Sequence, residues 1–164
     1  MALGLGTDVQ QIGGNSTGGT VLKGANRDII SGVGATRTLL AKESGALCLF
    51  DRAAGVVYTL PTPVAGMQFE FATTVTITSN AAKVITAAST QYLLGMVQVV
   101  GGTTETTVSA DFNGTTHVAI SMNGTTTGGV IGDRFLVTAI STTQWVISGI
   151  ASGSGTVATP AATS

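Results

Sequence analysis

The chain has 164 residues, and only 9% of them are charged (7 Lys or Arg and 8 Asp or Glu), with a formal net charge of −1. Soluble domains carry about 25% charged residues, and a balance this close to zero excludes the basic surface of a nucleic-acid-binding protein. The apolar runs, such as 45–50, are far shorter than the ~18 residues of a membrane-spanning helix, and a 43% hydrophobic content at low net charge argues against general disorder.

The first 35 residues are rich in glycine, with nine glycines and no apolar period of 2 or 3.6 residues. We therefore expect residues 1–35 to form an extended arm and not a domain. Residues 1–10 have neither a basic segment nor an apolar run of 7–15 residues, so the sequence predicts synthesis in a cytoplasm without a secretory signal.

From residue 36 onward, short runs of Val, Ile, Thr and aromatic residues alternate with turn residues every 8–12 positions. This spacing is typical of a β-sandwich or barrel. The expected strands are 36–41, 46–50, 56–60, 67–78, 83–87, 96–100, 106–112, 117–121, 134–140 and 145–150. The predicted fold is all-β, a β-sandwich or jelly-roll-like domain of about ten short antiparallel strands over 36–151, followed by a flexible or extended tail over 152–164.

The clearest strand is 67–78, in which Met67, Phe69, Phe71, Val75 and Ile77 share one parity. Helix is disfavoured by the 28 threonines, and only 91–96 is a candidate for one short turn.

The Asn113-Gly114 dipeptide is a hairpin signal between strands 106–112 and 117–121. If these strands pair, a three-residue loop (113–115) sets Val108 opposite Ile120, so that the apolar residues share one face.

Few residues are suited to catalysis. The single histidine, His117, is expected in mid-strand on the face opposite Val118 and Ile120, and no nucleophile motif accompanies it. The single cysteine, Cys48, alternates with apolar residues and is expected to be a small buried side chain. Glu70 and Asp111 are the carboxylates that would have to face each other in a glycosidase. We therefore predict no catalytic, cofactor or metal site and a protein that is not an enzyme.

The remaining motifs have structural interpretations. Asn15, Asn113 and Asn123 stand in glycosylation sequons, two of which are Asn-Gly turn signals. Asp51-Arg52 and Asp133-Arg134 are expected to form local turn-stabilising pairs or, alternatively, ion pairs with another protein. The glycine-rich stretch 124–132 is expected to be a surface loop, and Trp145 is expected to pack into the core.

The distribution of charge favours an assembly protein. Nine of the charged residues lie within 1–52 and only six lie within 53–164, none of them after Arg134. Exposed strand edges are usually protected by charge, proline or cover, and a chain with little of the first two is expected to be covered by copies of itself or by a partner.

The run DRAAGVVYTLP over 51–61, followed by Pro63 and Gly66, and the run MNGTTTGG over 122–129, followed by Gly132 and Trp145, resemble small virion proteins of tailed bacteriophages. The resemblance spans about 45–150. It implies a capsid decoration (cement) protein or related head protein, a β-sandwich or jelly-roll oligomer, often trimeric, whose partner is the major capsid protein.

The sequence favours three classes of function. The leading hypothesis is a decoration protein that binds and stabilises the outer surface of an icosahedral head, with residues 1–35 reaching over neighbouring capsid subunits and with no nucleic-acid or membrane partner. The alternative is a tail, fibre or other receptor-binding component of the virion. A cellular adhesin or carbohydrate-binding domain is the third.

Overall fold

The computed structural model describes residues 27–31, 34–102 and 106–164, and this part of the chain is nearly all β, as predicted. It contains twelve strands and one short 3-10 helix. The strands are β1 (Ile29–Ile30), β2 (Thr36–Thr38), β3 (Leu47–Phe50), β4 (Val57–Thr59), β5 (Gln68–Thr73), β6 (Ala82–Ile85), β7 (Tyr92–Gly101), β8 (Thr107–Asn113), β9 (Ala119–Met122), β10 (Arg134–Ala139), β11 (Gln144–Gly153) and β12 (Ala161–Ala162), and the 3-10 helix η1 is Ala41–Glu43.

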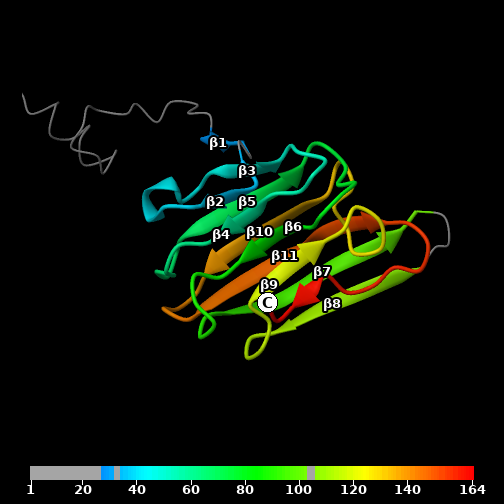
Figure 1. The fold of residues 1–164 in the computed structure, drawn as a ribbon. Coiled ribbons are helices and arrows are strands. Elements are labelled where there is room, and N and C mark those ends of the chain that lie inside the picture. The colour runs from blue at the N-terminus through cyan, green and yellow to red at the C-terminus, as the bar shows by residue number, and fades with distance from the viewer. Residues whose placement is uncertain (1–26, 32–33, 103–105) are drawn as a thin grey trace, which may run out of the picture.

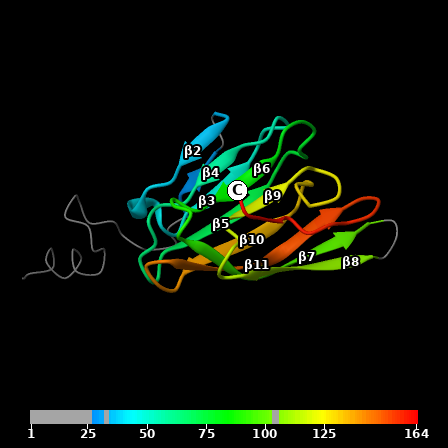
Figure 2. The ribbon, with the colours of Figure 1, turned by 60° about the horizontal axis from the view of Figure 1, so that its bottom comes forward.

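The strands form two sheets packed face to face (Figures 1 and 2). Sheet A has seven strands in the order β1-β3-β5-β10-β11-β7-β8, and sheet B has five in the order β12-β9-β6-β4-β2. The arrangement is sandwich-like, because one face of each sheet is turned toward the other and the second face toward solvent.

The first six strands alternate between the two sheets. β1, β3 and β5 are parallel neighbours in sheet A, while β2, β4 and β6 are parallel neighbours in sheet B. The chain therefore winds as a coil of three turns, each turn giving one strand to each sheet. Parallel neighbours need a crossover connection, and here the strand in the opposite sheet supplies it.

The second half of the domain is mixed. β10 and β11 form an antiparallel pair, β10 is antiparallel to β5, and β11 is parallel to β7. Five of the ten strand pairs in the described part of the chain are thus parallel. The prediction of antiparallel strands was wrong for these five pairs, and the topology does not confirm the jelly-roll alternative, whose strands are antiparallel.

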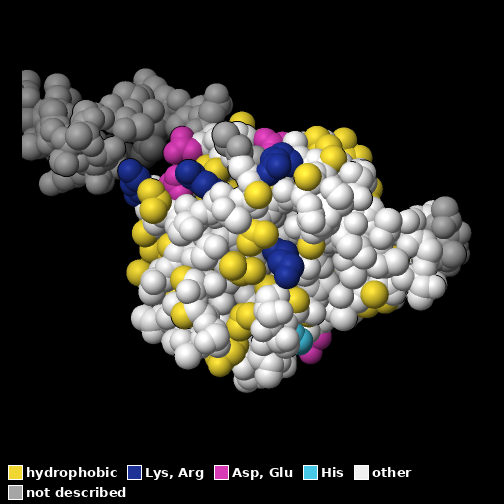
Figure 3. All heavy atoms as spheres, in the orientation of Figure 1, with side chains coloured by type: hydrophobic (Ala, Val, Ile, Leu, Met, Phe, Trp, Pro, Cys, Tyr) yellow, Lys and Arg dark blue, Asp and Glu magenta, His cyan; other side chains and the backbone are white. Residues whose placement is uncertain are grey.

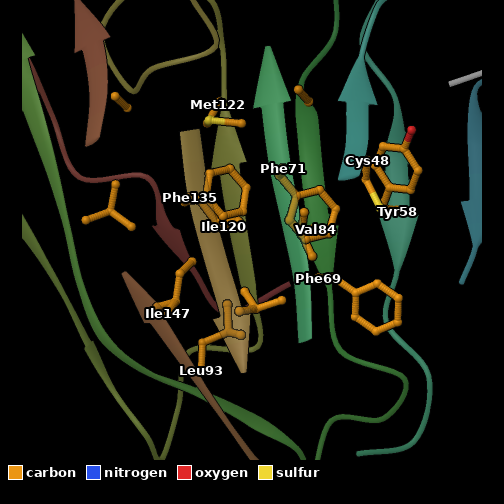
Figure 4. Packing of buried hydrophobic residues seen from close by; sticks show 14 of the residues in the cluster. Cys48, Tyr58, Phe69, Phe71, Val84, Leu93, Ile120, Met122, Phe135 and Ile147 are labelled. Atoms are coloured by element: carbon orange, nitrogen blue, oxygen red, sulfur yellow. The ribbon is translucent and has the colours of Figure 1, made fainter. Parts of the chain in front are cut away.

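The core lies between the sheets and contains all five phenylalanines, Trp145 and Tyr58. Figure 4 shows part of this cluster, including Tyr58, Phe71 and Phe135. Along β3, β5, β6 and β10 the buried positions alternate with exposed or half-buried ones. The prediction that Trp145 packs into the core is confirmed, because the side chain is fully buried at the start of β11.

All ten expected segments contain a strand, but their bounds differ. The segment 67–78 ends as a strand at Thr73, where the N–H groups of Thr74 and Val75 both donate to the carbonyl of Phe50 and bend the chain. As a result Val75 is exposed, whereas Ile77 is buried. The stretch 91–96 is not a turn: β7 begins at Tyr92 and runs through it.

The predicted hairpin at Asn113-Gly114 does not form. β8 pairs with β7 in sheet A, and β9 pairs with β6 and β12 in sheet B, so the turn carries the chain from one sheet to the other. The carboxamide oxygen of Asn113 accepts the N–H groups of Thr115 (3.0 Å) and Thr116 (2.9 Å). This Asx turn closes locally and leaves the following strand free to join the opposite sheet.

Both predicted flanking segments contribute a strand. Within 1–35, of which 1–26 and 32–33 lie outside the described residues, Ile29–Ile30 forms β1 against β3. Within 152–164, Val157 is buried and β12 is antiparallel to β9. The C-terminal residues thus lie along sheet B.

Gly124 provides a test of the close packing between loops. Its φ is +78° and a Cβ there would lie 1.8 Å from the carbonyl oxygen of Ile77, whereas Gly132, with φ +98°, would place its Cβ in open space. We expect Gly132→Ala to lower the free energy of unfolding by roughly 1–2 kcal/mol from the left-handed backbone alone. Gly124→Ala should cost about 3 kcal/mol or more, since the backbone of Ile77 must also move.

Urea denaturation followed by circular dichroism measures both variants against the native chain. Equal losses for the two variants would show that the contact with Ile77 does not constrain this loop.

Candidate functional site

The two carboxylates considered for glycoside chemistry are far apart. Glu70 in β5 and Asp111 in β8 lie on one row across the outer face of sheet A, which passes through Leu136, Ser148 and Met96. Four strand spacings of ~4.8 Å put their main chains about 19 Å apart. The carboxyl groups of glycosidases are separated by roughly 5–9.5 Å, so these two do not form such a pair.

Glu70 is instead held by two arginines. Its carboxylate accepts hydrogen bonds from the guanidinium groups of Arg27 and Arg134, and both pairs are salt bridges. The hydrogen bond from Arg27, followed by that from Arg134, holds the pKa of Glu70 below its ordinary value. We call this group the arginine-glutamate cluster; its net charge is +1.

Asp133 does not pair with Arg134, so the predicted local pair was wrong. Its carboxylate is buried and accepts the main-chain N–H groups of Gly129 (2.7 Å), Val130 (3.0 Å) and Ser152 (2.7 Å). Burial raises the pKa of Asp133, and these donors oppose the rise. The carboxylate thus fixes the glycine-rich stretch 124–132, which connects β9 in sheet B to β10 in sheet A.

His117 precedes β9 and is not in mid-strand. Its Nδ1 accepts the main-chain N–H of Asn113 at 3.2 Å, and its ring meets the ring of Phe112 edge-on at 5.8 Å between centroids. These contacts place the imidazole in the turn between the sheets, where it supports the Asx turn.

Cys48 is fully buried in β3, which confirms the predicted small apolar role. Burial raises the pKa of the thiol to about 12. At neutral pH the group is therefore a thiol, and reactive cysteines act as thiolates.

The two described sequon asparagines, Asn113 and Asn123, both form Asx turns. The carboxamide oxygen of Asn123 accepts the N–H groups of Thr125, Thr126 and Thr127 at 2.9–3.1 Å, in the same manner as Asn113 does for its two threonines. The repeated Asn-Gly-Thr-Thr sequence thus makes the same turn twice. Asn15 lies outside the described residues.

Among residues 27–31, 34–102 and 106–164, no three His, Cys, Asp or Glu side chains are grouped as a metal site. A search of the same residues for a helix long and apolar enough to cross a membrane finds none.

One end of the sandwich is formed by the first turn of the coil. β1 is one edge strand of sheet A and β2 is one edge strand of sheet B, and both lie at the end where Arg27 enters the fold. A hollow of about 380 Å³ lies there, lined by Asp28, Ile29, Ile30, Ser31, Arg37 and Glu43. We call β1, β2 and this hollow the open end.

Charge gathers at the open end. Arg37 forms a salt bridge with Glu43, and the arginine-glutamate cluster lies beside β1 and β3. On the face shown in Figure 3, most Lys, Arg, Asp and Glu side chains lie along the margin near β1–β3, and one basic side chain lies near the centre. Ile29 lies among these charged side chains and is 65% exposed.

The sequence contained a signal for the open end that its glycine content obscured. Arg27-Asp28-Ile29-Ile30 is a charged pair followed by two β-branched residues, which favour strands. Their parallel partner, β3, lies beyond η1 and β2 in the sequence, so no local pattern could identify it.

The outer face of sheet A is a second distinctive surface. Met96 and Val100 of β7 and Ile150 of β11 are 48%, 39% and 60% exposed, and half-buried Leu94, Leu136 and Val146 lie on the same face. Solvent-facing sides of mixed or antiparallel sheets are usually polar. The outer face of sheet A is therefore more apolar than the solvent-facing side of such a sheet usually is.

Comparison of the chain with protein-family models, curated proteins and solved structures finds no match.

The arginine-glutamate cluster makes stability depend on pH. In the folded chain the pKa of Glu70 lies below its ordinary value of 4.5. The contribution of ionised Glu70 to the free energy of unfolding is therefore complete above pH 4.5 and is lost as the pH falls through the lower pKa of the folded state. We expect Glu70→Gln to remove this part of the acid-induced loss of stability. The part amounts to about 1 kcal/mol or less, since the arginines are about half exposed and screened by solvent.

Urea unfolding of both proteins between about pH 3 and pH 6 measures the difference. A glutamine variant with the same acid-induced loss as the native chain would contradict the assignment.

Proposed function

We propose that this chain is a virion structural protein, specifically a capsid decoration protein that binds the outer surface of an icosahedral head and stabilises it. The observation that carries the proposal is that both sheets end in edge strands, β1 and β2, at the same end of the sandwich, where the chain arrives from residues 1–26. A partner there could extend both sheets at once.

The hydrogen-bonding pattern of β2 shows which main-chain groups such a partner would contact. The N–H of Leu39 donates to the carbonyl of Thr59, and the carbonyl of Ala35 accepts from the N–H of Val57, so the residues on either side of β2 are bonded to β4 and its flank. Because hydrogen-bonding directions alternate along a strand, the N–H and carbonyl groups of Thr36 and Thr38 point away from β4. They are suited to accept an added strand, a common mode of peptide recognition.

The short length of these edges fits binding through many weak contacts. β1 has two residues and β2 has three, so one junction offers few main-chain hydrogen bonds. On an icosahedral shell the same junction recurs many times, and linked contacts raise overall affinity well above that of each contact. A homo-oligomer, which the resemblance suggests is a trimer, made in the host cytoplasm and located on the outer capsid surface would act in this way.

The test is binding to purified heads that lack the protein. We expect the chain without residues 1–26 to keep its fold, because β1 is retained, and to lose at least 10-fold in affinity for the shell. Thr38→Pro, which removes a donor from the free edge of β2, should weaken binding several-fold, whereas the matched Thr38→Val variant retains the N–H and should bind as the native chain does.

Sedimentation of heads with bound protein, and the melting temperature of the decorated heads, measure the effect. Full binding and full stabilisation by the chain without residues 1–26 would overturn the proposal.

A tail or fibre component is the second candidate, and the three-turn coil favours it, because stacked turns of this kind can extend along an axis. The number of copies per particle separates the two. A decoration protein is present in hundreds of copies over the shell, whereas a tail or fibre component is confined to one vertex or the tail.

A further inference from the structure

The outer face of sheet A has apolar side chains at its centre. They come from the three adjacent strands β10, β11 and β7, and the members are Leu94, Met96, Val100, Leu136, Val146 and Ile150. Met96, Val100 and Ile150 are the most exposed of them. Apolar side chains grouped on an exposed face indicate an interaction surface more often than an ordinary free one.

The charges on this face lie on both sides of the apolar centre. The arginine-glutamate cluster, of net charge +1, consists of Glu70 on β5, Arg134 on β10 and Arg27, which precedes β1, whereas Asp111, of charge −1, lies on the edge strand β8. Between Glu70 and Asp111 the row contains only Leu136, Ser148 and Met96. β11 is the middle strand of the five from β5 to β8.

We propose that two copies of this chain associate through the outer faces of sheet A, about a two-fold axis that runs along β11. In this arrangement β11 faces its own copy, β10 faces β7 of the partner subunit, and β5 faces β8 of the partner subunit. Glu70 then lies opposite Asp111 of the partner subunit, twice per dimer, and the guanidinium groups of Arg27 and Arg134 bound to Glu70 give this margin the net positive charge that attracts Asp111. Aligned sheet packing of this kind is common between β-sheets.

The charges select this axis over the other two-fold axis in the plane of the interface. An axis across the strands would set β5 against β5 of the partner subunit, and two clusters of net positive charge would face each other. With the axis along β11, opposite charges meet at both margins and the apolar centre is covered by its own copy. An interface that is self-complementary in this way is what a two-fold contact requires.

The size of the face is sufficient for a specific contact. Five strands at ~4.8 Å and about eight residues at ~3.3 Å cover roughly 600 Å². The two copies together would bury about 1,200 Å², which is at the lower end of the range for specific, stable interfaces. The proposal concerns self-association and is independent of shell binding; it replaces the trimer suggested by the resemblance with a two-fold pair.

The first test compares two lysine variants by sedimentation equilibrium of the full chain. Ile150 is on the axis and is 60% exposed, and Ile131 is 63% exposed but lies in the loop before β10. Ile150→Lys places two like charges face to face and should weaken the dimer at least 10-fold. Ile131→Lys adds the same charge elsewhere and should leave the dimer unchanged.

The second test uses single cysteines and a bismaleimide cross-linker about 10 Å long, because the main chains of packed sheets lie ~10 Å apart, beyond the reach of a disulfide. Ser148 lies on β11 and should lie opposite Ser148 of the partner subunit, so Ser148→Cys should give a cross-linked dimer. Ser109, on the same outer face but on β8, lies two strands from the axis, about 19 Å from its own copy, and Ser109→Cys should remain monomeric on a denaturing gel. The native Cys48 is fully buried and does not compete.

A native chain that sediments as a monomer or a trimer would overturn the two-fold pair. A dimer that is insensitive to Ile150→Lys, or equal cross-linking at Ser148 and Ser109, would also overturn it.

These measurements use the free protein, so their failure leaves the shell-binding result unaffected. A chain that dimerises without binding heads would reject only the proposed function.

Discussion

The fold depends on a cluster of aromatic rings between the two sheets. The ring of Phe71 lies 5.9 Å from Phe50, 5.6 Å from Tyr58 and 5.1 Å from Phe135, measured between centroids. These four residues join β3, β5 and β10 of sheet A to β4 of sheet B. Aromatic side chains bury about 150–250 Å² each, so in a chain rich in glycine and threonine they supply much of the contact that holds the layers together.

Packing such large rings requires the opposite positions to be small. Gly149 is the partner of Phe135 across β10 and β11, and a Cβ at Gly149 would lie 2.4 Å from the Cβ of Phe135. Gly95 in β7 is also closely packed, because a Cβ at this position would lie 2.2 Å from the carbonyl oxygen of Ile147. Several glycines that gave the sequence a flexible composition are therefore fixed within the strands by close contact.

Local pattern identified ten of the twelve strands in the described part of the chain, all but β1 and β12, but did not identify their pairing. The alternation of Phe69 and Phe71 with polar residues identified β5, because a half-buried strand repeats every two residues. Parallel pairing within the coil depends on residues far apart, such as Leu47 and Glu70, and leaves no local trace. The Asn113-Gly114 signal was misinterpreted for a related reason: an Asx turn and a hairpin turn use the same residues, and only the tertiary structure decides which sheet receives the next strand.

The same limit applies to the surfaces. Scarcity of charge indicated that parts of the surface would be covered, and the fold shows that most of the described charges lie at the open end and at the two margins of the outer face of sheet A, whereas Lys83 lies on β6 in sheet B. The open end exposes main-chain groups of β1 and β2, and the outer face exposes side chains of β7, β10 and β11. Because one surface lies at a sheet edge and the other on a sheet face, a partner that extends the edges would not occupy the face. Attachment to a shell and pairing with a second copy would then proceed together, and each added contact would increase the number of junctions held at once.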